Sequence, residues 1–182
     1  MLRLFVVLAG LLLASAGAAM AQDNQTFAEP GHGYSLAYPT NWDLTVPGPF
    51  AIVLRPPSAT AGGPVAVSVE NARQPDEAGV QEGVALLTER YLSELGNHAR
   101  QVEVHRQAPF HWDVQGAAPL IGRQIVADFL RDEIPYRQWA VFLPNPAGPV
   151  VHVWLFTAPQ NLFAEWRPTA ETILNSLQPA RK

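Results

Sequence analysis

The sequence contains no cysteine, and this absence limits what the chain can be. It excludes a cysteine nucleophile and a framework of disulfide bonds. It also excludes a lipoprotein anchor, because such an anchor needs a cysteine at the cleavage site of its export signal. The folded chain must therefore depend on its hydrophobic core alone for stability.

Charge is also scarce and slightly acidic. Charged residues make up 15% of the chain, with 12 Lys and Arg against 16 Asp and Glu, so the net charge is −4. No basic stripe or run is present, and such a feature is the usual mark of a nucleic-acid-binding protein. The composition therefore predicts no nucleic-acid partner and disfavours binding to an anionic membrane surface.

Only the N-terminus carries a long hydrophobic run. Arg3 precedes an apolar stretch from Leu4 to Leu13, and Ala19-Met20-Ala21 forms a small-residue cleavage site. A membrane anchor is the alternative, but a span needs about 20 consecutive apolar residues and this run is shorter. We predict a signal peptide over residues 1–21, cleaved after Ala21, and hence a periplasmic or secreted protein without stable membrane insertion after cleavage.

The mature chain has the length of one domain. Cleavage leaves 182 − 21 = 161 residues and, because Arg3 is lost, a net charge of 11 − 16 = −5. A chain of this size buries roughly 70% of its unfolded surface, which is enough to fold without disulfides. We predict a flexible lead-in over residues 22–32 and a single domain over residues 33–178.

Alternation of apolar and polar residues predicts a series of short strands. Two turns, Arg131-Asp132-Glu133 and Pro144 to Gly148, connect successive strands as hairpins. The predicted strands lie near residues 34–38, 42–46, 50–54, 65–69, 102–104, 123–130, 136–143 and 150–157.

Two segments have the helical period instead. In the first, the apolar stripe ends at Leu95, with Asp76 as the expected N-cap and Gly96 as the expected C-cap. In the second, Pro168 must lie in the first turn or kink the helix. The fold class is therefore α+β, an antiparallel sheet of about six strands flanked by helices. The two stripes are Val80, Val84, Leu87, Tyr91 and Leu95, and Phe163, Trp166, Ala170, Ile173, Leu174 and Leu177.

Both ends of the domain resemble PsbP-like domains. Residues 33–42, GYSLAYPTNW, are similar to a pattern of glycine, aromatic, aliphatic, Tyr-Pro and tryptophan, and Thr157-Ala158-Pro159 precedes the last helix. The chain therefore resembles a bacterial exported member of the PsbP/Mog-like group, which includes DcrB. The resemblance implies an αβα sandwich and a non-catalytic accessory or binding role through protein partners. It carries over no catalytic, cofactor-binding or metal-binding residue.

The sequence contains no recognisable catalytic motif. No G-x-S-x-G pentapeptide is present, although a triad assembled from distant residues stays open because triads are defined by geometry. His105, His111 and Asp113 are close in sequence, but their spacing is not a known metal-ligand pattern and Pro109 is expected to break the strand between the histidines. We therefore predict no metal and no cofactor. His152 is expected to be hydrogen-bonded and partly buried.

Two further groups of residues are candidate sites. Asp128, Asp132 and Glu133 are expected to be ordinary surface charges, since nothing indicates the burial that tunes catalytic carboxylates. Trp112, next to Phe110, is the one tryptophan expected outside the core, in an apolar patch that faces a partner.

The sequence predicts an exported, non-catalytic accessory or binding domain that acts through a protein partner in the cell envelope. Two alternatives stay open at this point. One is a small envelope hydrolase with an unrecognised site, and the other is a carrier of a small apolar ligand between the sheet and a helix.

Overall fold

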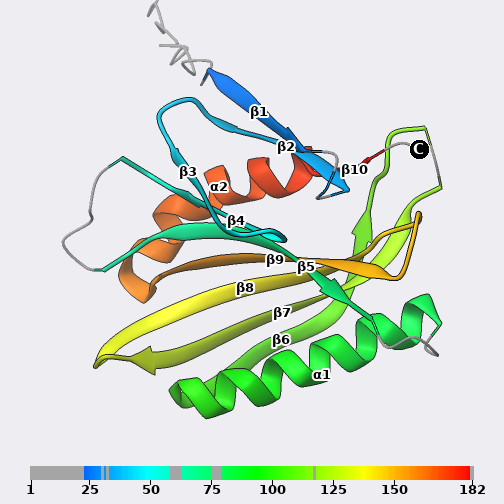
Figure 1. The fold of residues 1–182 in the computed structure, drawn as a ribbon. Helices are drawn as coiled ribbons and strands as arrows, with labels where there is room; N and C mark the ends of the chain where they lie inside the picture. Colours follow the sequence, from blue (N-terminus) through cyan, green and yellow to red (C-terminus); the bar gives the residue numbers. More distant parts are fainter. Residues whose placement is uncertain are drawn as a thin grey trace, which may run out of the picture.

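A computed structural model describes residues 23–29, 31, 33–57, 63–74, 79–116 and 118–180 of the chain. The predicted signal peptide and the predicted Asp76 cap lie outside these residues. A seven-stranded sheet forms the centre, with one helix on each face and a smaller three-stranded sheet beside the second helix (Figure 1). This is the predicted α+β sandwich, with one strand more in its main sheet.

Most strands follow one another along the chain without a helix between them, so most of their connections are hairpins. Every strand pair is antiparallel. The large sheet has the order β3-β4-β5-β9-β8-β7-β6, and the small sheet has the order β1-β2-β10. In chain order the elements are β1 (Asn24–Glu29), β2 (Tyr34–Pro39), β3 (Asp43–Gly48), β4 (Ala51–Arg55), β5 (Ala66–Arg73), α1 (Val80–His98), β6 (Arg100–Trp112), β7 (Leu120–Arg131), β8 (Ile134–Pro144), β9 (Val150–Pro159), α2 (Gln160–Ser176) and β10 (Gln178–Pro179).

Two hydrophobic cores lie on opposite faces of the large sheet. Alternate residues of β8 and β9 point to each face, so Val141 and Trp154 join the core under α2, whereas Phe142 and Val151 join the core under α1. The strands at the centre therefore have apolar residues on both sides. The small sheet adds Tyr34, Leu36 and Tyr38 to the core under α2, and this explains the alternation in the opening motif.

Strand β1 was not predicted. The segment assigned to a flexible lead-in forms this strand, and it pairs with the whole of β2 from Asn24–Pro39 to Glu29–Tyr34. Its sequence has only Phe27 as a large apolar residue, so no alternation marks it. Phe27 packs against the core, with its ring centroid 6.0 Å from that of Tyr34.

Strand β6 is much longer than predicted and contains Pro109. We expected Pro109 to break the strand between His105 and His111, and this was wrong. Because β6 is the last strand of the sheet, its outer edge has no partner strand, and a residue without an N–H is tolerated there. Two register shifts in the pairing of β6 with β7, between Arg100 and Glu103 and between Val104 and Arg106, also make this strand irregular.

Helix α1 follows the predicted stripe but ends two residues later than Gly96. Its cap is Ala99, whose N–H binds the Leu95 carbonyl oxygen at 2.9 Å. Ala99 has an extended conformation (φ −130°) and leads directly into β6, so the turn needs no glycine in a left-handed conformation. The predicted C-cap was therefore wrong, whereas Val84 and Leu95 are buried as expected.

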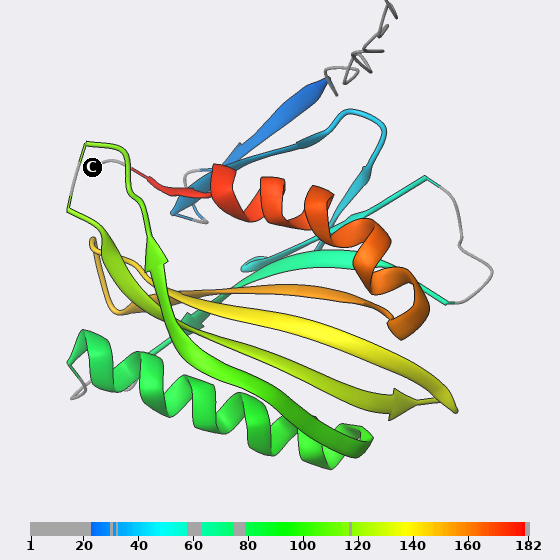
Figure 2. The same ribbon diagram turned by 180° about the vertical axis from the view of Figure 1, so that it is seen from behind.

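Helix α2 begins at Gln160, so Pro168 lies in its interior rather than in its first turn. A proline there removes one backbone hydrogen bond and bends the helix, and the orange and red parts of α2 run in different directions in Figure 2. The buried stripe is nevertheless continuous, with Phe163, Ala170 and Ile173 facing the core. Among the described residues, no helix combines the length and apolar character needed to cross a membrane.

Candidate functional site

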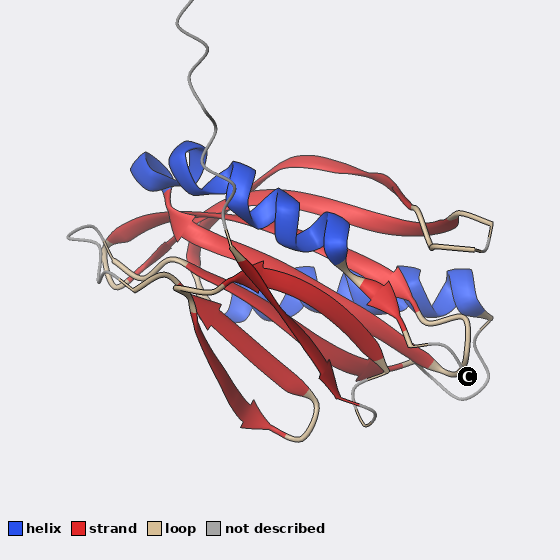
Figure 3. Ribbon diagram, turned by 90° about the horizontal axis from the view of Figure 1, so that it is seen from above, coloured by secondary structure: helices blue, strands red, loops and turns tan. Residues whose placement is uncertain are grey.

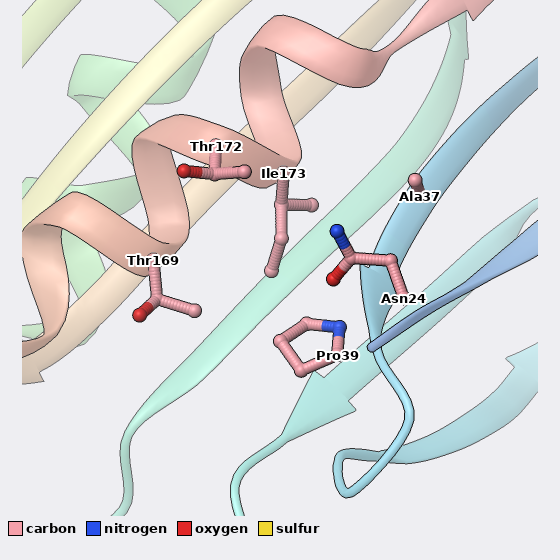
Figure 4. A pocket seen from close by; sticks show the side chains of 6 residues that line it. All are labelled: Asn24, Ala37, Pro39, Thr169, Thr172 and Ile173. Atoms are coloured by element: carbon pink, nitrogen blue, oxygen red, sulfur yellow. The ribbon is translucent and has the colours of Figure 1, made fainter. Parts of the chain in front are cut away.

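A cavity of about 250 Å³ lies between α2 and the outer side of the small sheet. Figure 4 shows Ile173 and Asn24 pointing toward each other across it, with Pro39 below. The cavity is open to solvent on one side. Its lining residues come from three elements: Asn24 from β1, Ala37 and Pro39 from β2, and Thr169, Thr172 and Ile173 from α2. We call it the α2 groove.

The period of the small sheet explains why the groove is there. Tyr34, Leu36 and Tyr38 turn inward, so the other side of β2 carries the short residues Ser35, Ala37 and Pro39. Asn24 lies opposite Pro39 in the register and shares that side. Short side chains next to a helix leave a hollow that long side chains would fill.

Ser176 fastens α2 to the edge of β2 at the end of the groove. Its hydroxyl accepts a hydrogen bond from the Ala37 N–H at 2.8 Å and lies 2.7 Å from the Ile173 carbonyl oxygen. Ala37 pairs with Thr26 of β1 on one side, and on the other edge of β2 these contacts take the place of a neighbouring strand. The Ser176 hydroxyl thus links the backbones of β2 and α2, the two walls of the groove, and has a structural role.

The chemistry of the α2 groove is neutral. Among the residues that the structure describes, no carboxylate, imidazole, amine or guanidinium group lines it. Thr172 donates its hydroxyl to the Pro168 carbonyl oxygen at 3.0 Å, but within the described part of the chain the Asn24 amide and the Thr169 hydroxyl have no hydrogen-bond partner. The groove thus offers an apolar floor with free donors and acceptors, which suits binding of an uncharged group rather than acid–base chemistry.

A cluster of charged residues lies elsewhere, on the face of the large sheet that α2 packs against. It lies over β6 and β7, which α2 does not cover. Asp128 is at the centre and its side chain is only 13% exposed. Arg137 donates to both of its oxygens, at 2.7 and 2.8 Å, and His105 Nε2 lies 2.7 Å from Oδ2. The prediction that Asp128 is an ordinary surface charge was wrong. Asp132 and Glu133 are exposed at their turn, where Glu133 pairs with Arg100 at 2.7 Å.

These contacts determine the ionisation of Asp128. Partial burial alone would raise its pKa, but the hydrogen bonds from Arg137 and His105 outweigh burial and hold the pKa below its ordinary value. The carboxylate is therefore charged and fully engaged at neutral pH. An engaged carboxylate that accepts three hydrogen bonds is poorly placed to act as a general base, so the network reads as structural.

The predicted metal candidates do not meet. His105 binds Asp128, whereas His111 and Asp113 are exposed further along β6 and in the loop that follows it. Over the described ranges, no three side chains of His, Cys, Asp or Glu are placed to hold a metal ion.

Trp112 lies in the core, and its prediction as a partner-facing residue was wrong. Its side chain is 3% exposed, and its indole N–H donates to the Leu177 carbonyl oxygen at 3.0 Å. Phe110 is partly buried against the same core, so the expected patch does not form. The reason is the length of β6, which carries Trp112 beneath the C-terminal segment instead of into a loop.

We expect Trp112→Phe to lower the free energy of unfolding by about 1.5 kcal/mol, because it leaves the buried Leu177 carbonyl without its donor. Urea denaturation followed by far-UV circular dichroism measures this loss. Amide exchange should increase at the same time at the Ala180 N–H, which lies just after β10 (Gln178–Pro179) and donates to the Gly33 carbonyl oxygen at 2.8 Å. A loss below about 0.5 kcal/mol would show that the hydrogen bond contributes little.

His152 is more buried than predicted. It is 0% exposed, and its Nδ1 lies 2.7 Å from the Asn71 side-chain oxygen, as expected for a hydrogen-bonded histidine. Since an amide oxygen only accepts, the ring proton lies on Nδ1. The rings of Tyr34 and Trp112 pack on it at 5.1 and 6.3 Å. Burial lowers the pKa of His152 to about 4.

Sequence reasoning missed the α2 groove because its residues are unremarkable one by one. Two threonines, an alanine and a proline carry no motif, and Asn24 lies in a segment without a visible strand pattern. The one usable signal was the set of short residues at alternate positions of 34–39, which indicates a side of the strand without long side chains.

No family model and no curated protein matches the chain. Solved structures do resemble it over most of its length. Cyanobacterial PsbP (CyanoP) of Synechocystis sp. PCC 6803 has a TM-score of 0.62 at 16% identity, over 92% of this chain and 99% of that one. LpqN of Mycobacterium tuberculosis, which is involved in cell envelope biogenesis, has a TM-score of 0.57 at 14% identity, over 87% and 92%.

The Ran-binding protein Mog1p of Saccharomyces cerevisiae is similar too, with a TM-score of 0.54 at 10% identity over 87% of this chain and 96% of that one. Identities this low show a shared fold and no more. The chain therefore has the PsbP/Mog-like fold that the resemblance at its two ends implied.

Proposed function

We propose that this protein is an exported, non-catalytic binding module of the cell envelope that acts through a protein partner. The observation that carries the proposal is the neutral α2 groove, which provides free hydrogen-bonding groups but no ionisable group. A similar fold serves Ran binding in Mog1p and cell envelope biogenesis in LpqN, and the predicted signal peptide supports export.

The size of the groove favours a partner's side chain over a free ligand. Drug-sized ligands occupy pockets of about 300–1,000 Å³ and are buried almost completely. A volume of about 250 Å³ that is open on one side is smaller, yet it exceeds the 150 Å³ or so that is enough for a benzene ring. We infer that it accepts one uncharged side chain, with the Asn24 amide and the Thr169 hydroxyl as donors to an adjacent peptide carbonyl.

A hydrolase lacks support on this surface. Ser176 is the serine of α2, and its hydroxyl is committed to backbone atoms of Ala37 and Ile173. The His105–Asp128 pair resembles part of a triad, but Arg137 occupies the same carboxylate. Neither group is arranged to activate a nucleophile.

Filling the groove should abolish partner binding. The variant Thr169→Phe places a ring in the cavity without removing core atoms, and Ala164→Phe is a matched control because Ala164 is exposed on the same helix. We expect mild cross-linking in the native envelope, followed by affinity recovery and mass spectrometry, to yield one recurring protein at near-equal abundance with the wild type and Ala164→Phe. Recovery should fall at least fivefold with Thr169→Phe.

Two results would contradict the proposal. In one, all three proteins are recovered without a partner. In the other, the purified wild type hydrolyses an ester, amide or glycoside substrate, and loses this activity when His105 or Asp128 is replaced. Far-UV circular dichroism of each variant separates a filled groove from a misfolded protein.

A further inference from the structure

The turn between β3 and β4 exposes apolar side chains that belong to neither of the two hydrophobic cores of the described residues. Phe50 is 57% exposed and Val46 is 49% exposed, the two largest exposed fractions among the large hydrophobic residues of the described chain. Pro47, Gly48 and Pro49 lie between them. The hairpin forms the edge of the large sheet opposite β6 (Figure 3), so its turn is not covered by either helix. We call residues 46–50 the β3–β4 tip.

The tip is rigid although it is exposed. Proline fixes φ at two of its five positions, and Gly48 pairs with Ala51 to close the turn. The Phe50 carbonyl oxygen accepts a hydrogen bond from the Asn71 N–H of β5 at 2.8 Å, which fastens the backbone of the turn to the sheet. An exposed aromatic ring held in one place loses little conformational entropy on binding, which is the property of a binding anchor.

No charge accompanies the exposed side chains. Every residue from Leu44 to Leu54 is uncharged, and the flanking Asp43 and Arg55 lie opposite each other at the far end of the hairpin. A surface without charge is best matched by an apolar surface, since a charged partner would lose hydration without gaining an ion pair. The binding partner of the tip should therefore present an apolar cleft.

We propose that the β3–β4 tip is a second contact with the protein partner, with Phe50 inserted into an apolar cleft of that protein. This inference rests on the proposed function and adds the chemistry of the partner. A lipid surface fits less well. The side chains of the tip hold about 16 carbons, comparable to a single myristoyl chain, which by itself holds a protein on a membrane only marginally. The acidic net charge opposes binding to anionic lipids.

Edge-to-edge pairing of β3 with another strand also fits poorly. The register shifts between Thr45 and Gly48, and Pro47 lacks an N–H. Both features interrupt the hydrogen-bonding edge where an added strand would pair. The available contact is therefore the side chains of the tip rather than its backbone.

The test compares Phe50→Ser with Leu86→Ser in the full chain expressed in its own cells. Leu86 is 41% exposed on α1, so the control loses a similar exposed side chain from another surface. We expect Phe50→Ser to reduce recovery of the cross-linked partner at least tenfold and Leu86→Ser to leave it within twofold. In a second variant, the photo-reactive amino acid benzoylphenylalanine replaces Phe50. It should label an apolar cleft of the partner that is recovered by cross-linking.

Each other outcome rejects the inference in a distinguishable way. Equal recovery with Phe50→Ser, together with loss on Thr169→Phe, removes the tip from the interface and leaves the proposed function intact. If the probe labels a second copy of this chain, the tip mediates self-association instead of binding a different protein. If the purified protein floats with vesicles of phosphatidylethanolamine and phosphatidylglycerol, and Phe50→Ser abolishes this flotation, the tip binds a membrane instead of a protein. Absence of any partner with every variant rejects the proposed function itself.

Discussion

Replacing Trp154 with alanine is expected to lower the free energy of unfolding by about 4 kcal/mol, as is typical when a buried tryptophan is truncated to alanine. Trp154 is fully buried at the centre of β9, where it lies opposite Val69 of β5 and Val141 of β8. The ring of Trp139 packs on it edge to face at a centroid distance of 5.3 Å. Chemical denaturation at pH 7, followed by circular dichroism, measures the loss.

The variant Trp154→Phe separates packing from hydrogen bonding. The indole N–H of Trp154 is buried and has no hydrogen-bond partner among the described residues. Phenylalanine removes this unpaired donor, which offsets part of the lost volume, and a loss of only about 1 kcal/mol is expected. If Trp154→Phe were as damaging as Trp154→Ala, the N–H would have a partner that the structure does not show.

The strands at the centre of the sheet could be predicted because the alternation of apolar and polar residues matches the buried and exposed sides of each strand. In β2 and β5, large apolar residues alternate with small or polar ones, and this alternation predicts the inward residues correctly. The apolar stripes of α1 and α2 are equally direct. Each of these patterns depends on contacts that an element makes with one face of the protein.

The edges of the sheets were harder to predict, since position in a sheet is not encoded locally. Pro109 is compatible with β6 only because that strand is last in the sheet. In the same way, β1 is a strand because β2 provides a complete partner, although its own residues show no alternation. Strand order determined both outcomes, and strand order follows from contacts between distant segments.

The site was harder still to foresee. The α2 groove joins residues from both ends of the chain, Asn24 and Ile173, through short side chains that signal nothing alone. Asp128 appeared to be a surface charge because its two partners come from neighbouring strands. His105 reaches it from β6, beside the register shift between Val104 and Arg106, and Arg137 reaches it from β8.

The arrangement of charge bears on how the protein recognises its partner. The charged groups on the open side of β6 to β8 are largely paired with one another, as in the contact of Arg137 with Asp128. The α2 groove and the β3–β4 tip, in contrast, carry no charge at all. Binding through these two surfaces should therefore depend only weakly on salt concentration.

Acidification should destabilise the protein through His152, the buried histidine beneath the C-terminal segment. Burial lowers its pKa to about 4 in the folded protein, whereas an unfolded histidine has a pKa of about 6.5. Between these values the unfolded chain binds a proton that the folded protein excludes, so stability is present above pH 6.5 and decreases as the pH falls. The contribution of His152 to this loss is about 3 kcal/mol between pH 7 and pH 4, since each pKa unit corresponds to 1.36 kcal/mol.

The variant His152→Gln tests this assignment because glutamine stays neutral at every pH and can still donate to the Asn71 side-chain oxygen. It should be somewhat less stable than the wild type at pH 7, because its shape fills the site less well between Tyr34 and Trp112. Its free energy of unfolding, measured by urea denaturation at intervals from pH 7 to pH 4, should nevertheless decrease by about 3 kcal/mol less than that of the wild type. His111→Gln, at an exposed position of β6, is the matched control and should retain the wild-type slope. Equal slopes for the wild type and His152→Gln would mean that His152 is protonated in the folded protein, and that the acid sensitivity comes from the engaged carboxylates instead.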